Sequence, residues 1–210
     1  MLVVHHLNDS RSQRILWLLE ELGAPYEIKP YQRDAATRLA PPELKAVHPL
    51  GKSPVITDGD ITIAESGAIV DYLVRKYGKG GMGVALGTPE GEKYNEWLHY
   101  AEGSAMLPLM LNMYVMRLGE AGAPLHPRIQ SEMANHLSYV EGSLEGRDWL
   151  MGSALTAADI QMSFVGEVAR AFGQMATYPN IKAWLERFQA RPAYRAALEK
   201  GGAYNLGPAK

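Results

Sequence analysis

The sequence predicts a small α/β domain with the element order β-α-β-α-β-β-α, followed by an all-α helical domain. Three observations predict this division: strand-like and helical patterns alternate early in the chain, a glycine-rich stretch follows, and only helical spacing is found beyond it. We therefore expect the α/β domain over residues 1–78, a linker over 79–90 and the helical domain over 91–210.

Local patterns justify each element of the first domain. Apolar side chains from Ile15 to Leu22 recur at helical spacing, and Gly23 follows as a typical C-terminal residue. Asp58-Gly59-Asp60 predicts a tight turn between two strands. The expected elements are a strand over 2–6, a helix over 12–22, a strand over 26–31, a short helix over 42–47, strands over 55–57 and 61–63, and a helix over 65–77.

The second domain shows helical spacing alone, for example in the apolar residues from Tyr94 to Ala101. Further helices are expected over 124–144 and 156–172. Thr156 and Asp159 form a variant capping box at the start of the 156–172 helix, and its role should be purely structural.

Composition excludes several classes of function. The net charge is −2, whereas a nucleic-acid-binding surface normally shows a basic excess. The absence of cysteine excludes disulfides, thiolate metal sites and any mechanism that needs a protein thiol. The histidines form no metal-ligand pattern, so no metal site is expected. No apolar run is long enough to span a bilayer and the first residues lack the features of a signal peptide, so a cytoplasmic location is expected.

Ser10 precedes the first expected helix, with Gln13 three residues later, and Ser-x-x-Gln is a capping-box pattern. The same hydroxyl can also donate a hydrogen bond to a bound anion, so a structural and a functional role both stay open. A ligand thiol held near this helix N-terminus would have its pKa lowered, as protein cysteines do there. Lowering that pKa by about two units corresponds to about 2.7 kcal/mol.

Two further segments could bind a ligand. Ser53-Pro54 opens an expected strand: a trans proline would merely start the strand, whereas a cis bond would turn the Ser53 backbone toward an extended peptide. Glu65 and Ser66 begin the next helix, where an acid and a hydroxyl complement the free N–H groups. The same N-terminus also suits the carboxylate of an α-amino acid, whose amine could pair with Glu65.

Together these motifs resemble the glutathione S-transferase superfamily along essentially the whole chain. Their order and spacing are more specific than any one of them. Two segments, Tyr31–Asp34 and Pro41–Lys45, are similar to the bacterial and fungal branch of the superfamily. The matching segments are Ser10–Gly23, Pro49–Ile56, Ile63–Ile69, Leu155–Ile160 and Tyr178–Trp184.

The resemblance implies a thioredoxin-like first domain that binds glutathione, with a cis Pro54. Ser10 occupies the position of the catalytic serine in serine-type members. A proline often follows closely there, and because Ser12 stands in its place, Ser12 and Asn8 are alternates for Ser10. The implied glutathione contacts are Lys52 at the glycine carboxylate, the backbone of Ser53 at the cysteinyl part, Pro54, Glu65 and Ser66 at the γ-glutamyl head group, and Glu102 of the partner subunit.

The implied activity is conjugation of the glutathione thiolate to hydrophobic electrophiles, with glutathione peroxidase activity as a variant of the same chemistry. The lack of cysteine excludes the cysteine-type classes. Two alternatives stay open: a disulfide reductase that uses two glutathiones, and a non-catalytic homologue that binds glutathione or another ligand. The electrophile is expected between the two domains beside five residues, each of which could also be ordinary core: Tyr100, Met106, Met110, Met113 and Tyr114.

The resemblance also sets expectations about partners. Glutathione would be a cosubstrate, with no cofactor bound permanently, and a small apolar electrophile would be the second substrate. We expect a homodimer, because the family resemblance implies one and two-fold dimers are the commonest oligomers. No nucleic acid partner is expected.

Overall fold

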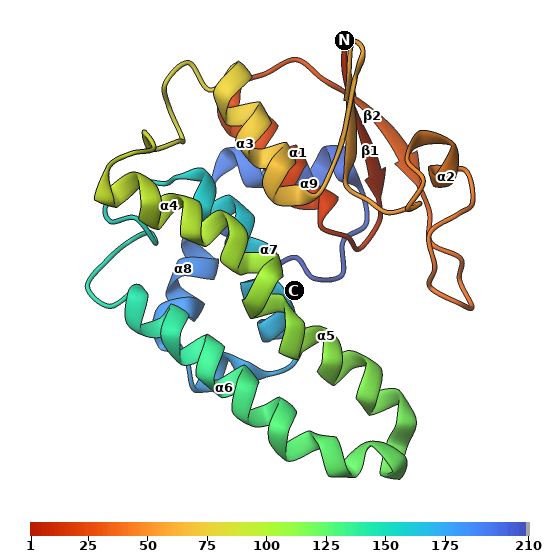
Figure 1. The fold of residues 1–210 in the computed structure, drawn as a ribbon, viewed down its shortest axis with the longest axis vertical. Coiled ribbons are helices and arrows are strands. Elements are labelled where there is room, and N and C mark those ends of the chain that lie inside the picture. Colours follow the sequence, from red (N-terminus) through yellow and green to blue (C-terminus); the bar gives the residue numbers. More distant parts are fainter. Residues whose placement is uncertain (209–210) are drawn as a thin grey trace. The chain divides into compact units, whose positions relative to one another are not determined.

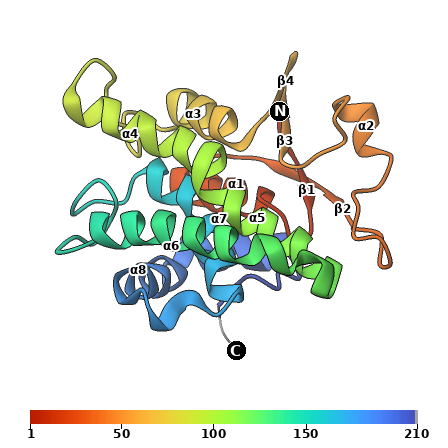
Figure 2. The same ribbon diagram turned by 60° about the horizontal axis from the view of Figure 1, so that its bottom comes forward.

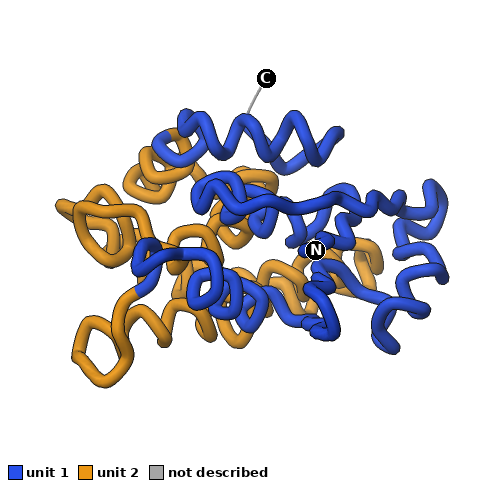
Figure 3. Tube along the Cα trace, turned by 90° about the horizontal axis from the view of Figure 1, so that it is seen from above, with its two compact units in different colours: residues 1–83, 187–210 blue, residues 84–186 orange. Residues whose placement is uncertain are grey.

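The computed structural model describes residues 1–208, which form two compact units (Figure 3). Unit 1 combines residues 1–83 with the C-terminal segment from Arg187, and unit 2 is Val84–Glu186. Unit 1 is therefore built from both ends of the chain, whereas the sequence analysis placed the C-terminal segment with the helical domain.

Unit 1 contains a four-stranded mixed sheet (Figure 1). Its strand order is β2-β1-β3-β4; β2 runs parallel to β1, whereas the other neighbours are antiparallel. The strands and the helices between them confirm the predicted order β-α-β-α-β-β-α. The bounds are β1 (Leu2–Leu7), α1 (Ser12–Leu22), β2 (Glu27–Tyr31), α2 (Leu44–Val47), β3 (Val55–Asp58), β4 (Ile61–Ala64) and α3 (Ser66–Tyr77).

Helix α1 is the centre of the helical layer of unit 1. It packs against β1, against α3 and against the C-terminal helix α9 (Pro192–Gly201). Trp17 is fully buried and stacks on Phe188 at 5.0 Å, while Tyr194 meets it edge-on at 5.5 Å. Burying one such ring contributes about 1.5–3 kcal/mol, so the aromatic cluster is a main anchor of α9.

Ion pairs at the ends of α1 and α9 explain further why the C-terminal segment belongs to unit 1. Arg191 binds the Glu21 carboxylate through two nitrogens, and Lys200 Nζ lies 2.6 Å from Glu20 Oε1. Both glutamate side chains are largely buried: that of Glu21 is 9% exposed and that of Glu20 is 15% exposed. No local pattern in the sequence encodes these pairs, because the two partners are 170 positions apart in one pair and 180 in the other.

Strand β1 separates two environments because successive side chains point to opposite faces of a sheet. His5 and Leu7 face the side of α2: His5 Nδ1 lies 3.0 Å from the Tyr31 hydroxyl, and Leu7 packs with Tyr31 and Leu44. His6 points the other way, toward α1 and α9, and is 3% exposed. The two adjacent histidines therefore have unrelated surroundings.

Unit 2 is helical throughout, apart from an isolated bridge between Trp149 and Gly152, within the residues described (Figure 2). Helix α7 is almost entirely buried, and Gly166 allows it close approach: a Cβ there would stand 2.8 Å from the Trp184 ring. The bounds are α4 (Pro89–Tyr100), a π-helical turn (Ala101–Ala105), α5 (Met106–Val115), a 3₁₀ segment (Met116–Leu125), α6 (His126–Ser143), α7 (Ala157–Ala171), a 3₁₀ turn (Gln174–Ala176) and α8 (Pro179–Gln189).

Two helix starts differ from the sequence expectation. Helix α4 begins at Pro89, inside the expected linker, because Thr88 Oγ1 accepts a hydrogen bond from the Gly91 N–H and caps the helix. Helix α6 begins at His126 rather than at 124, since the preceding residues form a 3₁₀ segment interrupted at Gly119, where φ is 57°.

Candidate functional site

Three loops of unit 1 meet at one edge of the sheet. The pairing register places His5 opposite Val55 and Val55 opposite Ala64, so the end of β1, the start of β3 and the end of β4 lie together. The residues that continue from these ends are Ser10, Ser53 and Glu65, which the sequence analysis selected separately. The register therefore gathers one candidate from each predicted segment.

The N-terminus of α1 carries a buried chain of hydrogen bonds. Ser10 Oγ lies 2.8 Å from Ser12 Oγ, which lies 2.8 Å from His6 Nδ1, and His6 Nε2 lies 3.1 Å from the Gly201 carbonyl oxygen. Ser10 and Ser12 are 3% and 0% exposed. Burial lowers the pKa of His6, and the hydrogen bond to Gly201 opposes that shift only in part. The ring is therefore neutral near pH 7.

The predicted capping box at Ser10 is wrong. Arg11, not Ser10, is the N-cap residue of α1, and it makes no side-chain cap. Ser10 Oγ instead accepts from the Ser12 N–H at 3.2 Å. The side chain of Gln13 is buried near Gly201, because a Cβ on that glycine would stand 2.7 Å from Gln13 Oε1. The glutamine thus turns into the interface between α1 and α9 and away from the Ser10 backbone.

Asn8 is held just after β1 by Arg33. Its Oδ1 accepts from the Arg33 N–H at 2.8 Å, and its carbonyl oxygen accepts from Arg33 Nε at 3.0 Å. The first of these bonds fixes which end of the amide is oxygen. The Nδ2 donor then points away from Arg33, and among residues 1–208 it has no hydrogen-bond partner.

The Ser53–Pro54 peptide bond is cis, as the resemblance implies. Ser53 Oγ donates to the His5 carbonyl oxygen at 2.8 Å, which fastens this loop to β1. Within the described part of the chain, the backbone N–H and C=O of Ser53 have no hydrogen-bond partner. They are thus available to an extended peptide. Lys52 beside them is exposed.

Glu65 and Ser66 stand at the N-terminus of α3, as predicted. Glu65 is exposed and has φ 67°, a left-handed conformation that costs a residue other than glycine about 1–3 kcal/mol and that clusters at ligand sites. Ser66 is 3% exposed, and its Oγ accepts from Arg14 Nη2 at 3.0 Å. The buried Arg14 guanidinium adds positive charge to a helix N-terminus that already favours anions.

The residues expected beside the electrophile all lie in unit 2, on α4 and α5. Met106 is buried, Met110 and Met113 are half-buried, and Tyr114 is 53% exposed. Tyr100 is half-buried, and its hydroxyl lies 2.7 Å from His136 Nδ1. Burial raises the pKa of Tyr100 above its usual value, so the phenol stays protonated. Glu102 lies in the π-helical turn that joins α4 to α5.

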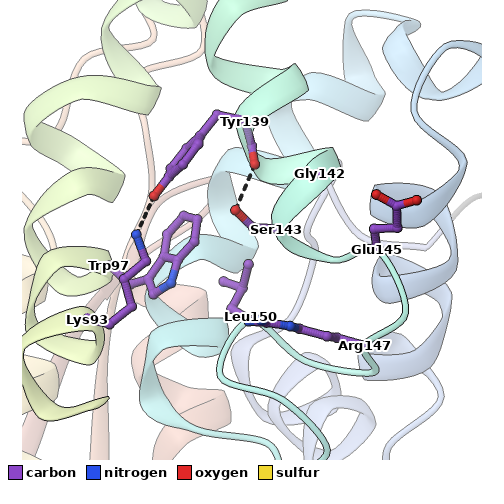
Figure 4. Close-up of a pocket in the computed structure, with 8 residues that line it drawn as sticks. All are labelled: Lys93, Trp97, Tyr139, Gly142, Ser143, Glu145, Arg147 and Leu150. Atoms are coloured by element: carbon purple, nitrogen blue, oxygen red, sulfur yellow. Dashed lines mark hydrogen bonds between the residues drawn. The ribbon is translucent and has the colours of Figure 1, made fainter. Parts of the chain in front are cut away.

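A cavity of about 410 Å³ opens on unit 2, and none of the five residues expected beside the electrophile lines it (Figure 4). Trp97 and Tyr139 stack at 5.4 Å, and Lys93 Nζ lies over both rings. The Tyr139 hydroxyl donates to Glu96 Oε1 at 2.9 Å. The lining residues are Lys93, Trp97, Tyr139, Gly142, Ser143, Glu145, Arg147 and Leu150.

No group of three or more potential metal ligands is found among residues 1–208. In the same residues, no helix combines the length and the apolar character that crossing a bilayer requires.

The comparisons with known proteins agree along the chain. The model of the glutathione S-transferase N-terminal domain matches residues 1–75, and that of the C-terminal domain matches residues 104–192. Glutathione S-transferase 3 of Schizosaccharomyces pombe is 38% identical, with 95% of this chain and 88% of the relative aligned. This chain belongs to the glutathione S-transferase superfamily.

Further members resemble this chain in sequence and in fold. Glutathione S-transferase 1 of Saccharomyces cerevisiae is 34% identical, with 95% of each chain aligned. A crystal structure of a glutathione S-transferase from Actinobacillus pleuropneumoniae has a TM-score of 0.88 and 38% identity, covering 98% of this chain and 95% of the other. The family confirms the thioredoxin-like fold expected of the first domain.

Sequence reasoning missed three members of the site. Arg14 was read only as part of a matching motif, His6 only as a strand residue, and Arg33 only as part of a branch-specific segment. Their partners lie between 6 and 195 positions away in the chain. The alternation of β1 could have placed His6 on the face of α1, but not beside Ser12.

Proposed function

We propose that the protein conjugates the thiolate of glutathione to small apolar electrophiles. The observation that carries this proposal is the sheet edge where the open backbone of Ser53, the N-terminus of α3 and the loop after β1 lie together. Glutathione is an extended tripeptide with an α-amino acid head and a second carboxylate. Each of its parts has a chemical counterpart at this edge.

The tripeptide is proposed to bind as an additional strand-like segment against Ser53. The γ-glutamyl carboxylate accepts from Ser66 Oγ and from the free N–H groups of α3, and its amine pairs with Glu65. Lys52 takes the glycine carboxylate. Arg14 Nη2 donates a hydrogen bond of 3.0 Å to Ser66 Oγ and so helps to position that hydroxyl.

The thiolate is proposed to form at Ser10. Both serines are buried, but Ser12 is less suited to direct contact, because its hydroxyl engages His6 and the backbone of Leu7 in addition to Ser10. The Asn8 Nδ2 group is an alternative donor, since none of the residues described accepts its hydrogens. One hydrogen bond to the anion together with the α1 N-terminus can supply the ~2.7 kcal/mol that a two-unit pKa shift requires.

The electrophile is proposed to bind the side of unit 2 formed by Tyr100 and α5. Methionine side chains there are flexible and polarizable, and so suit apolar ligands of varied shape. The thiolate attacks the electrophilic carbon, a C–S bond forms, and the leaving group departs with the bonding electron pair. Attack on a peroxide oxygen follows the same first step.

One observation favours a second candidate, a disulfide reductase that uses two glutathiones. The chain has no cysteine, so a second glutathione must supply the thiol that a protein cysteine would otherwise provide. A glutathione transferase family member from Pseudomonas fluorescens, 26% identical to this chain, was crystallised with two glutathione bound. Assays with an aryl halide, an organic peroxide and a small disulfide separate the activities.

A homodimer is also proposed, with Glu102 of the partner subunit near the amine of glutathione. Large apolar side chains exposed on α5 and the following segment supply area for such contact, namely Leu107, Leu111, Tyr114, Met116 and Leu118. Sedimentation should give twice the chain mass at micromolar concentration, and a monomer would contradict both parts of this proposal.

Calorimetric titration with glutathione tests the binding site. Ser66→Ala should weaken binding by about 1–3 kcal/mol, because a hydrogen bond to a charged group is lost. Ser131→Ala, an exposed serine on α6, is the matched control and should bind as the wild type does. Unchanged affinity in a folded Ser66→Ala protein would remove Ser66 from the site, and no binding by the wild type would refute the proposed function.

A further inference from the structure

We propose that His6 is the proton acceptor for the thiol of glutathione, acting through Ser12 and Ser10 as a positioning residue buried behind the site. This inference rests on the proposed function, since it explains how the bound thiol loses its proton. It is carried by the chain of hydrogen bonds from Ser10 to Gly201 and by the direction in which each bond must run.

The direction follows from the chemistry of the end groups. The Gly201 carbonyl oxygen only accepts, so His6 Nε2 must carry a hydrogen and donate to it across 3.1 Å. The neutral ring then presents a lone pair at Nδ1. Ser12 must therefore donate to Nδ1 across 2.8 Å rather than to the more distant Leu7 carbonyl oxygen at 3.3 Å.

The same argument orients Ser10. Ser12 donates its one hydroxyl hydrogen to His6. Its oxygen therefore accepts from the Leu7 N–H at 3.2 Å and from the Ser10 hydroxyl at 2.8 Å. Ser10 in turn accepts from the Ser12 N–H. In the resting protein both hydroxyl hydrogens thus point inward, and Ser10 can accept a hydrogen bond from a thiol but has none left to donate.

Ionisation of glutathione reverses the direction of these hydrogen bonds through a series of balanced proton transfers. The S–H bond breaks and its proton passes to Ser10 Oγ, the Ser10 proton passes to Ser12 Oγ, and the Ser12 proton passes to His6 Nδ1. The electron pair of the broken bond stays on sulfur. His6 becomes an imidazolium that donates at both nitrogens, and Ser10 now donates to the thiolate.

The surroundings of His6 suit an acceptor. The ring bonds Ser12 on α1 and Gly201 on α9, and His6 pairs with Pro30 in β2. Gln13 and Leu16 of α1 lie beside the same Gly201, and none of these residues carries a charge. Burial lowers the pKa of His6, so the ring is neutral before glutathione binds, and the same burial opposes its protonation. The Gly201 carbonyl stabilises the imidazolium once it forms, because its hydrogen bond favours the protonated ring.

Nuclear magnetic resonance of the imidazole nitrogens tests the relay. In the free protein at pH 7, His6 should be the neutral tautomer protonated at Nε2. Saturating glutathione should convert it to the imidazolium, whereas S-methylglutathione, which has no thiol proton, should leave it neutral. His5 faces Tyr31 on the opposite side of the strand and should not respond to either ligand.

A variant supplies the kinetic test. His6→Gln retains a donor for the Gly201 carbonyl but cannot take up a proton, and it should lower the thiolate fraction of bound glutathione at pH 7 about tenfold, with activity recovering as pH rises. His5→Gln is the matched control and should titrate as the wild type does. If His6 stays neutral while bound glutathione is ionised, the relay is overturned and the proposed function stands. If glutathione does not bind to the wild type, the proposed function itself fails.

Discussion

Two buried polar networks stand at helix N-termini, one in each unit, and they differ in a way that separates structure from function. At α7, the Asp159 carboxylate accepts four hydrogen bonds, from the Leu150 and Thr156 N–H groups, the Thr156 hydroxyl and Trp184 Nε1. At α1, Ser10, Ser12 and His6 each both donate and accept. The first network has one fixed arrangement of hydrogens, whereas the second has two.

The number of possible hydrogen arrangements determines whether each network can move a proton. An acceptor-only group surrounded by donors holds the backbone in place and has no proton to move. A row of hydroxyls that ends on an imidazole can reverse the direction of its hydrogen bonds when protons shift along it, while its oxygen and nitrogen atoms stay in place. In this protein, the network of donor–acceptor groups at α1 is therefore the one expected to act on a ligand proton, and the network built on Asp159 is expected to stabilise the start of α7.

The largest expected effect falls on the fixed network. Asp159→Ala leaves four donors without their acceptor, two of them buried and two part-buried, and should lower the free energy of unfolding by about 3–5 kcal/mol. Denaturant unfolding measures the loss, and the Thr156→Ala protein serves as a milder comparison. A loss below about 1 kcal/mol would mean that the carboxylate does not organise this region.

Ser12→Ala should cost less stability but should change the chemistry. It removes a buried hydroxyl that holds the Leu7 N–H, which costs about 1–3 kcal/mol, and it interrupts the path from Ser10 to His6. The bound thiol should then be less ionised at pH 7 than in the wild type. Ser12→Thr keeps the hydroxyl and should restore the thiolate; equal titration curves for wild type and Ser12→Ala would show that the path is not used.

A second carboxylate, Asp58, sharpens the comparison because its pKa shifts in the opposite direction from that of Asp159. Burial opposes its ionisation, but hydrogen bonds from Lys76, Tyr77 and Tyr72 outweigh burial and lower its pKa to about 2. For Asp159, the effect of burial outweighs that of its hydrogen bonds, and its pKa rises above the usual value. The charge of Lys76 and the nearness of solvent account for the difference, since no cation binds Asp159 in the described structure.

This difference sets the pH dependence. The folded pKa of Asp58 lies below the unfolded value of about 3.9, so its contribution is complete above that pH and is lost as pH falls toward 2. Asp58→Asn should destabilise the protein by about 1–2 kcal/mol at pH 7, because solvent screens part of the ion pair. Unfolding experiments should show this gap closing between pH 4 and 2; a gap that widens there would reverse the assignment.

The smallest expected effect is that of the Thr156 cap. Thr156→Ala removes the hydroxyl that donates to Asp159 and that takes part in the capping box, but it leaves the three other donors on Asp159, so it should cost about 1 kcal/mol. Its thiolate titration should match the wild type. A cost as large as that of Asp159→Ala would show that the hydroxyl, rather than the carboxylate, organises the start of α7.

The same two helix starts show what a sequence can predict. Thr156-x-x-Asp159 and Ser10-x-x-Gln13 have similar patterns, and the first forms the predicted capping box, whereas the second does not. Asp159 gains its extra donors from neighbours in unit 2. Gln13 is drawn into the contact with α9, which follows some 190 residues later, so local pattern could not reveal that Ser10 would pair with Ser12 instead.

The fold itself was largely predictable because its signals are local. Helix α1 ends at Leu22 with Gly23 at φ 60°, and the strands flanking Gly59 pair antiparallel, as the turn residues indicate. The return of α9 to unit 1 was not predictable, because it depends on Trp17, Glu20 and Glu21 meeting partners at the far end of the chain. The candidate residues were found, but their mutual geometry was not.

The most direct test of the account is the ultraviolet titration of the thiolate of bound glutathione in wild type, Ser10→Ala and Asn8→Ala. The account predicts that Ser10→Ala raises the pKa of the bound thiol by about one unit or more, which corresponds to a tenfold loss of thiolate at neutral pH. Conjugation should recover as pH rises. An unshifted curve in Ser10→Ala, with glutathione bound normally, would contradict the account, and a shift confined to Asn8→Ala would move the thiolate contact to that amide.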